Sequence, residues 1–282
     1  GIDLGARAAA STEPRLATIH RLEQAVQSRL PPAQLRPADL VHRALGRLAH
    51  APKVLGPITV QGVPDLDPVW RPLLLKLAGV VPVIRVIATQ LPSTAISIDT
   101  TSPAVAAAAI DAGAHLINDV WGVAEDPGMV RLAAEMGVPI VLMHNRAEAR
   151  YRNLVAEVVA DLQRALERAT DAGVPWDHLV VDPGFGFGKT PDHNVALLAD
   201  LGALRVLGRP ILLGTSRKST LGKLLDLPPD QRAEATAATT ALGIAAGADI
   251  VRVHDVRENA RTARIADAIL RGWRPDGWPG GA

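Results

Sequence analysis

Short apolar runs and longer amphipathic segments alternate along the chain from about residue 92 onward. A short β-branched run bounded by turn residues is typical of a buried strand, and a longer segment with apolar residues at helical spacing is typical of a helix. The short runs predict strands at 95–98, 115–118, 139–143, 179–181, 211–213 and 250–253. The longer segments predict helices at 103–112, 128–136, 154–172, 194–207, 232–246 and 258–271.

This regular alternation predicts parallel strands, because each helix returns the chain to the same end of the sheet. A further strand-like run at 2–4 brings the count to seven. With 282 residues the chain has the length of a single α/β barrel, which has eight strands and about 250 residues. We therefore predict a (β/α)8 TIM barrel as one domain over 1–272, apparently without its first β/α unit, and a loose Pro- and Gly-rich tail at 273–282.

The segment 15–67 departs from the alternation. Helix-like spacing occurs at 17–29 and 38–49, and 58–61 is a possible strand. The apolar stretch 70–89 then predicts the helix that leads into the next barrel strand. We expect 15–67 to be a helical insertion after the second barrel strand, since barrels accept long insertions in the loops that follow strands.

Composition narrows the possible functions. A formal net charge of +1 provides no broad basic surface for nucleic acid, although a local anion site needs only a few Lys, Arg and backbone N–H groups. Cysteine is absent, which excludes disulfides and thiolate metal sites. No apolar run approaches the ~20 residues of a membrane span, and no signal-peptide pattern is visible. We expect a soluble cytoplasmic protein.

Ionisable and amide side chains follow the predicted strands at the points where those strands end. In a barrel these ends share one rim, so residues far apart in sequence converge on one pocket. The candidates are Asp99, Asn118, Met143, Asp182, Lys218, Arg252 and His254.

Several of these residues also fit purely structural explanations. Asp99 precedes Thr100-Thr101-Ser102-Pro103, and Asp, Thr or Ser before a Pro is a common helix start. Asn118 and its neighbour Asp119 could form only a turn. Strand alternation would place Arg252 and His254 on the same face of the strand. This placement suits either an edge of the sheet that faces solvent or a pair of side chains that bind one anion.

The glycine-rich stretch after Asp182 resembles two phosphate-binding motifs but matches neither. A P-loop needs Gly where Pro183 stands, and the third Gly comes one residue early for a dinucleotide fingerprint. A turn with Phe185 and Phe187 remains. Such a turn lets backbone and rings approach a flat ligand, while the carboxylate accepts paired N–H groups from an amino-heterocycle.

Five motifs together resemble those of the dihydropteroate synthases in order and approximate spacing, over about 92–271. They are Ser97-Ile-Asp-Thr100, Ile117-Asn-Asp119, Asp182-Pro-Gly-Phe-Gly-Phe-Gly-Lys189, Ser216-Arg-Lys-Ser219 and Arg252-Val-His-Asp255. The resemblance implies a pterin-binding TIM barrel. It also implies condensation of 6-hydroxymethyl-7,8-dihydropterin diphosphate with para-aminobenzoate, giving 7,8-dihydropteroate and pyrophosphate for folate synthesis.

The resemblance also implies roles for individual residues. Asp99, Asn118 and Asp182 would form hydrogen bonds to the pterin ring. Lys218 would reach the oxygen and nitrogen side of the ring, and Met143 and Phe187 would pack against it. Arg252 and His254 would hold the diphosphate. The catalytic set would be Asp99, Asp182, Lys218, Arg252 and His254. A Mg²⁺ cofactor and a homodimer are implied as well.

Two departures from the family pattern leave the metal ligands unassigned and two other functions open. The family's first-strand motif, whose Asn contributes to the metal–diphosphate site, has no counterpart in the sequence, and the second-strand motif is altered at 3–14. A non-catalytic pterin-binding paralogue is one alternative. A methyltetrahydrofolate-dependent methyltransferase is the other, but it has no use for the diphosphate clamp implied by Ser216-Arg217-Lys218 and Arg252-Val-His254.

Overall fold

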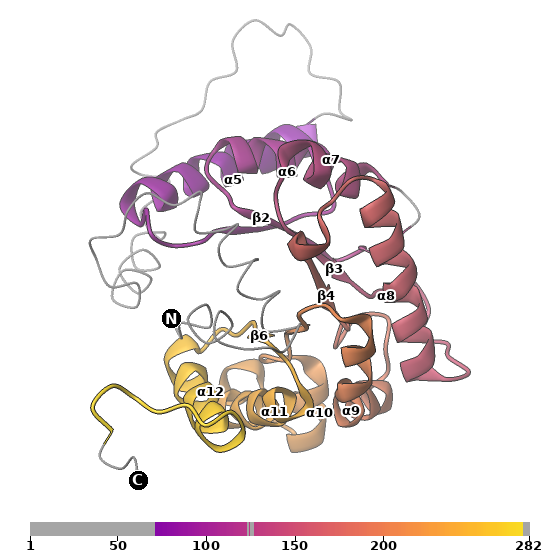
Figure 1. Ribbon diagram of the computed structural model, residues 1–282, viewed down its shortest axis with the longest axis vertical. Helices are drawn as coiled ribbons and strands as arrows, with labels where there is room; N and C mark the ends of the chain where they lie inside the picture. The colour runs from indigo at the N-terminus through magenta and orange to yellow at the C-terminus, as the bar shows by residue number, and fades with distance from the viewer. Residues whose placement is uncertain (1–70, 123, 125–126, 279–282) are drawn as a thin grey trace, which may run out of the picture.

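The computed structural model describes residues 71–122, 124 and 127–278 (Figure 1). The expected strand at 2–4, the altered motif at 3–14 and the proposed insertion at 15–67 lie outside the described residues, as does the end of the expected tail. The domain division therefore stays a prediction.

Six parallel strands follow one another in the described chain. They are β1 (Ser97–Asp99), β2 (Leu116–Asp119), β3 (Ile140–Met143), β4 (Leu179–Asp182), β5 (Leu212–Leu213) and β6 (Ile250–Val251). The first four pair in chain order, β5 pairs with β6, and a bridge from Val181 to Ile211 joins the two groups. The strands thus run in the sequential order of a barrel wall.

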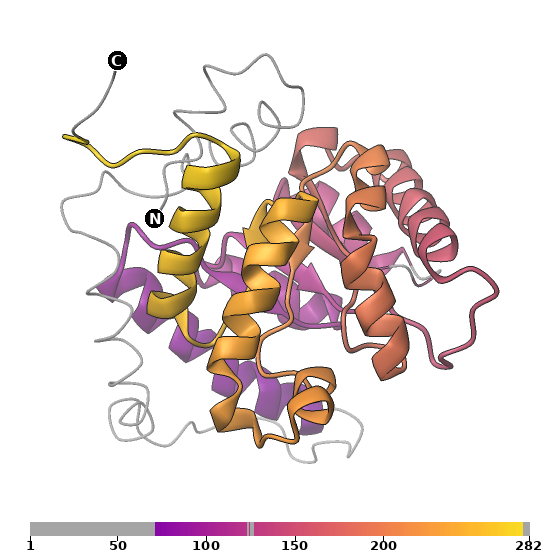
Figure 2. The same cartoon turned by 90° about the horizontal axis from the view of Figure 1, so that it is seen from below.

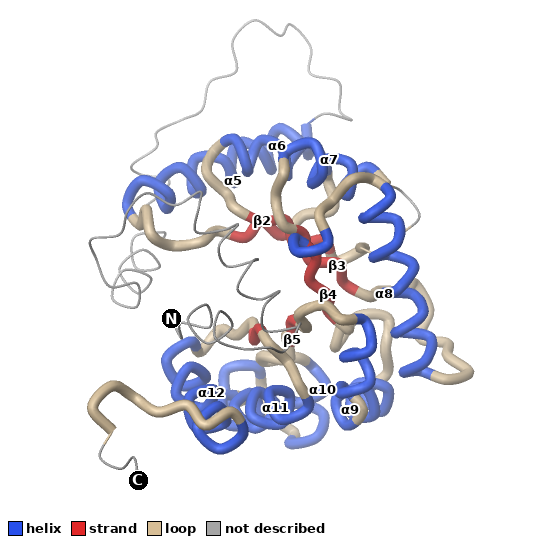
Figure 3. The backbone as a smooth tube through the Cα atoms, viewed as in Figure 1, coloured by secondary structure: helices blue, strands red, loops and turns tan. Residues whose placement is uncertain are grey.

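Helices surround these strands on the outside (Figures 1 and 3). They are α5 (Arg71–Gln90), α6 (Pro103–Asp111), α7 (Gly128–Met136), α8 (Leu154–Asp171), α9 (Pro191–Ala199), α10 (Ser219–Leu225), α11 (Ala233–Ala246) and α12 (Val256–Leu270). Three 3₁₀ helices accompany them, η1 (Trp176–His178), η2 (Leu201–Leu207) and η3 (Pro229–Gln231). None of the described helices is long and apolar enough to cross a membrane.

Two rows of strand side chains form two different cores. The outward row, exemplified by Ile117, Leu142 and Val181, belongs to the large core shared with the helices. The inward row, exemplified by Val141 and Val180, packs in a small separate cluster inside the barrel. Strands buried on both faces explain why the sequence shows continuous apolar runs rather than alternation.

Most predicted elements are confirmed with their ends within two residues, but one helix differs by more and one helix was not predicted. The predicted helix at 194–207 begins instead at Pro191, because Thr190 caps it by accepting a 3.2 Å hydrogen bond from the N–H of His193. It stops at Ala199, and η2 continues the path. The strand predicted at 250–253 ends at Val251, and α10 was not predicted at all.

The described architecture confirms the TIM-barrel fold class predicted from the sequence. Successive parallel strands line the inside and each connection passes through a helix on the outside. This arrangement places the carboxyl ends of all six described strands at one rim, where barrel enzymes carry their active sites.

Candidate active site

A polar layer lies directly above the apolar interior of the barrel. Asn118, Met143 and Asp182 each stand two residues after an inward apolar residue, namely Leu116, Val141 and Val180. Because side chains two residues apart share one face of a strand, all three point into the barrel at its carboxyl end. Met143 is fully buried there.

Direct contacts join four of the predicted residues. Asn118 donates through Nδ2 to Asp99 Oδ2 at 3.0 Å, and Arg252 Nη1 donates to Asn118 Oδ1 at 2.9 Å. Arg252 also lies 3.6 Å from Asp99 Oδ2 and, through Nη2, 3.5 Å from Asp182 Oδ2. Asp99 therefore faces Asn118 and Arg252 and does not cap α6, whose N-cap position is occupied by Ser102. We call Asp99, Asn118, Asp182 and Arg252 the inner row.

Asp182 is the most deeply placed acid of the inner row, with 2% of its side chain exposed. Its Oδ1 accepts a 2.7 Å hydrogen bond from the N–H of Gly184. Burial raises the pKa of Asp182, and this hydrogen bond and the cations Lys218 and Arg252 oppose the rise. A buried carboxylate with this much remaining acceptor capacity can bind further N–H groups from a ligand.

The glycine-rich turn after Asp182 packs closely against neighbouring protein atoms. Gly184, Gly186 and Gly188 all have positive φ. A side chain at Gly184 would collide with the carbonyl oxygen of His144, and one at Gly186 would approach Lys218 Cδ to 2.7 Å. The turn buries Phe185 and leaves Phe187 half-buried. Only Phe187 is therefore placed to contact a ligand over any appreciable area.

Lys218 reaches the turn from the loop between β5 and α10. Its Nζ donates to the carbonyl oxygen of Phe185 and lies 4.4 Å from the centre of the Phe187 ring. Burial lowers the pKa of Lys218 to about 8, while Asp182 acts in the opposite direction. Lys218 is thus linked to the inner row through the charge of Asp182.

The backbone before Lys218 is held in an unusual conformation. Arg217 has a φ of 58°, a left-handed value that costs free energy for a residue other than glycine. Arg232 Nη1 donates to the Arg217 carbonyl oxygen at 2.8 Å, and Thr236 Oγ1 accepts from the Arg217 N–H at 3.2 Å. These contacts stabilise the bend from which Lys218 enters the site.

His254 occupies a separate position from Arg252. Its Nδ1 lies 2.9 Å from Ser216 Oγ, and its backbone N–H donates to the same oxygen at 3.1 Å. Next to it, Arg217 and Asp255 form two hydrogen bonds, of 3.1 and 2.5 Å, which lower the pKa of Asp255. The loops after β5 and β6 are therefore tied together, with His254 exposed at their junction.

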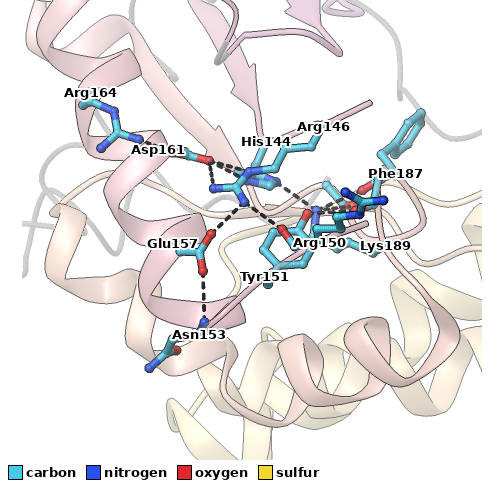
Figure 4. A network of polar contacts seen from close by, with 12 residues as sticks. His144, Arg146, Arg150, Tyr151, Asn153, Glu157, Asp161, Arg164, Phe187 and Lys189 are labelled. Carbon is cyan, nitrogen blue, oxygen red and sulfur yellow. Dashed lines mark hydrogen bonds and ion pairs between the residues drawn. The ribbon is translucent and has the colours of Figure 1, made fainter. Parts of the chain in front are cut away.

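A second polar network lies on the outer side of the same rim (Figure 4). It contains His144, Arg146, Glu157, Asp161 and Lys189, and we call it the outer network. Sequence reasoning placed His144 at the end of a predicted strand and Lys189 at the end of the motif after Asp182, but assigned neither a role and did not single out the other three. Strand alternation offered a signal for His144, since Met143 points inward and the next residue must point outward.

Metal binding gains no support from the described side chains. Among residues 71–122, 124 and 127–278 there is no group of three or more His, Cys, Asp or Glu residues that could hold a metal ion.

Comparison with known proteins places these features in a family. The family model described as "Pterin binding enzyme" matches residues 75–254. Dihydropteroate synthase of Bacillus subtilis is 48% identical over 195 residues, covering 69% of this chain and 68% of the relative. Dihydropteroate synthase of Mycobacterium leprae is 42% identical over 253 residues, covering 84% and 87%.

Solved structures agree with the sequence relatives. A dihydropteroate synthase from Clostridium difficile, solved in the presence of pteroic acid, has a TM-score of 0.69 and 37% identity, covering 83% of this chain and 88% of its own. The enzyme from Xanthomonas albilineans with 4-aminobenzoic acid has a TM-score of 0.69 and 34% identity, with 82% and 86% covered. The chain therefore belongs to the pterin-binding enzyme family and, within it, to the dihydropteroate synthases.

Proposed function

We propose that this chain joins 6-hydroxymethyl-7,8-dihydropterin diphosphate, hereafter pterin diphosphate, to para-aminobenzoate through the site at the rim of its barrel. The amine nitrogen forms a bond to the pterin methylene carbon while the carbon–oxygen bond to the diphosphate breaks. The bonding electrons leave with pyrophosphate and the amine proton passes to solvent. One solved relative was obtained in the presence of pteroic acid, which supports the proposed product. Another was solved with 4-aminobenzoic acid, which supports the proposed nucleophile.

The observation that carries the proposal is the buried carboxylate of Asp182. It is 2% exposed, holds one hydrogen bond of 2.7 Å within the described chain and lies 3.5 Å from Arg252. A flat amino-heterocycle offers paired N–H groups that such a carboxylate accepts. Asp99 and Asn118 provide further acceptors and a donor in the same layer.

The pterin ring would lie between the polar layer and the glycine-rich turn. Lys218 would donate to the oxygen and nitrogen side of the ring, and Phe187 and Met143 would contact its faces. Because bond breaking leaves positive charge delocalised into the pterin, Asp99 and Asp182 stabilise the developing cation. Little general-base help is needed, since an arylamine nucleophile loses its proton readily after attack.

The diphosphate would lie toward Arg252 and His254. Arg252 is 38% exposed, so its guanidinium is open to an anion while it stays anchored to Asn118. His254 and Ser216 provide additional donors at the neighbouring loop junction. Positive charge at this position favours departure of pyrophosphate, because the leaving group gains negative charge in the transition state.

Magnesium belongs to the proposal through the family resemblance alone. When bound, it would supply charge neutralisation for the diphosphate. The described residues contain no group of three or more His, Cys, Asp or Glu that could hold it, and the steps above rest on the residues of the chain.

A homodimer and a cytoplasmic location complete the proposal. Helices α11 and α12 lie side by side (Figure 2). Their exposed apolar side chains Leu242, Ile265 and Ile269 support an interface between two copies. Analytical ultracentrifugation tests this part: Ile269→Glu should shift a dimer toward monomer. A wild-type chain that sediments as a monomer at micromolar concentration would contradict it.

Pyrophosphate release in the presence of both substrates and Mg²⁺, measured beside calorimetric binding of pterin diphosphate, tests the activity. Turnover that requires para-aminobenzoate supports the proposal. Tight binding of pterin diphosphate without turnover would instead identify a non-catalytic pterin-binding barrel. Transfer of a methyl group from methyltetrahydrofolate, with no pyrophosphate release, would favour the methyltransferase.

A further inference from the structure

The glycine-rich turn is held between two lysine side chains. Lys218 Nζ donates to the carbonyl oxygen of Phe185. Lys189 Nζ donates to the carbonyl oxygens of Gly184 and Phe187, at 3.1 and 3.0 Å. Three of the four carbonyls from Gly184 to Phe187 therefore accept a hydrogen bond from a lysine.

In its ammonium form, Lys189 has an acceptor for every donor, although burial lowers the pKa of Lys189 to about 7. An ammonium group carries three N–H donors, and the third points to His144 Nδ1 at 2.9 Å. His144 is fully buried, and burial lowers its pKa to about 4, so the ring is neutral near pH 7. A neutral ring with one acceptor nitrogen suits the Lys189 contact.

The other nitrogen of His144 is fixed by the rest of the outer network (Figure 4). His144 Nε2 lies 3.1 Å from Asp161 Oδ2, which assigns the ring proton to Nε2 and leaves Nδ1 as the acceptor. Arg146 donates to the same carboxylate through Nε at 3.0 Å and through Nη2 at 2.7 Å. Helix α8 is thereby connected through Asp161, His144 and Lys189 to the backbone of the turn.

We propose that Lys189 is a positioning residue for the synthase reaction: it sets the path of the turn that presents Phe187 to the pterin ring. This inference rests on the proposed function, because it assigns Lys189 an effect on pterin binding. Lys189 itself faces His144 and the turn backbone, so it acts through the placement of Phe187 without touching the substrate.

The chemistry of the contact explains the requirement for lysine. Only a compact group with three diverging donors can satisfy two carbonyls and one imidazole nitrogen at once. Methionine has nearly the same length and no donor. Arginine keeps the charge but places its donors in a flat fork, which does not match three acceptors arranged around one nitrogen.

Calorimetric binding of pterin diphosphate to four full-length proteins tests the proposal: wild type, Lys189→Met, Phe187→Ala and the double variant. We expect Lys189→Met to weaken binding about tenfold in the wild-type background and less than about twofold when Phe187 is already Ala. Lys223→Met, which changes an exposed lysine on α10, is the matched control and should leave affinity unchanged.

Equal losses of affinity in both backgrounds would overturn the proposal, because a purely structural lysine lowers stability without coupling to Phe187. Unchanged binding by Lys189→Met would overturn it as well. If Lys189→Met does not fold, Lys189→Arg replaces it in the wild-type and Phe187→Ala backgrounds. Equal losses of affinity in both backgrounds, or unchanged binding, would then overturn the proposal in the same way. Failure of the wild-type protein to bind pterin diphosphate would reject the proposed function instead, and the wild-type measurement separates the two cases.

Discussion

The inner row and the outer network are both polar clusters at the carboxyl end of the barrel strands, yet they differ in how fully their hydrogen bonds are used. Within the described chain, Asp182 of the inner row accepts one hydrogen bond. Asp161 of the outer network contacts Arg146, Arg164 and His144. Saturated groups hold the backbone in place, whereas groups with remaining capacity are available to a ligand.

Neighbouring residues on one strand separate the two clusters. Met143 points into the barrel and His144 points to the outside, although both are fully buried. Burial alone therefore does not distinguish a residue proposed to contact the ligand from a supporting one. The difference lies in which side of the barrel wall each side chain faces and in how many partners it finds there.

The largest effect is expected for Asp182→Asn. The amide keeps the shape but loses the charge and half of the acceptor capacity, so affinity for pterin diphosphate should fall by more than about 100-fold, roughly 3 kcal/mol. Calorimetry measures this loss, and Asp171→Asn, at an exposed position on α8, is the control. An Asp182→Asn protein with wild-type affinity would remove Asp182 from the site.

Lys218→Met should lower the affinity about 30-fold, roughly 2 kcal/mol, because a charged donor to the ligand is lost. Burial lowers the pKa of Lys218 to about 8, so its charge is disfavoured in the folded protein at pH 7. The melting temperature of Lys218→Met should therefore be equal to or above that of wild type. A variant that loses both binding and stability would place Lys218 with the supporting residues.

The outer network predicts a dependence of stability on pH. Burial lowers the pKa of His144 from 6.5 to about 4, so the unfolded chain binds the proton more tightly between these values. This stabilising contribution is complete above pH 6.5 and is lost as the pH falls toward 4, amounting to about 3 kcal/mol. Urea unfolding of wild type and His144→Gln at several pH values measures it. Parallel pH profiles for the two proteins would contradict the assignment.

The smallest effect compares two buried asparagines. Asn118→Ala removes the bridge between Asp99 and Arg252 and should weaken binding of pterin diphosphate about tenfold. Asn259→Ala breaks a 2.7 Å hydrogen bond from Thr240 between α11 and α12, and should cost about 1 kcal/mol of stability while affinity stays within about twofold. Equal losses of affinity in the Asn118→Ala and Asn259→Ala proteins would contradict the distinction between the inner row and residues that only stabilise the fold.

The order of strands and helices was predictable because local periodicity encodes it. The short runs around Ile117, Val141 and Val180 identified strands, and Asp99, Asn118, Asp182 and Arg252 were predicted at one rim from their positions after those strands. The turn after Asp182 was also recognised from its spaced glycines. The helix after this turn was predicted to begin at 194 but begins at Pro191, since the prediction followed the apolar pattern and did not consider Thr190 as a cap.

The sequence by itself determined the barrel order, the polar strand ends and the family, because these depend on residues close together in the chain. Tertiary structure alone decided which polar residues contact one another. The bond from Arg252 to Asn118 joins residues 134 positions apart, and that from Lys189 to His144 joins residues 45 apart. Such pairings arise only when the strands lie side by side and each side chain faces inward or outward, and no local pattern carries that information.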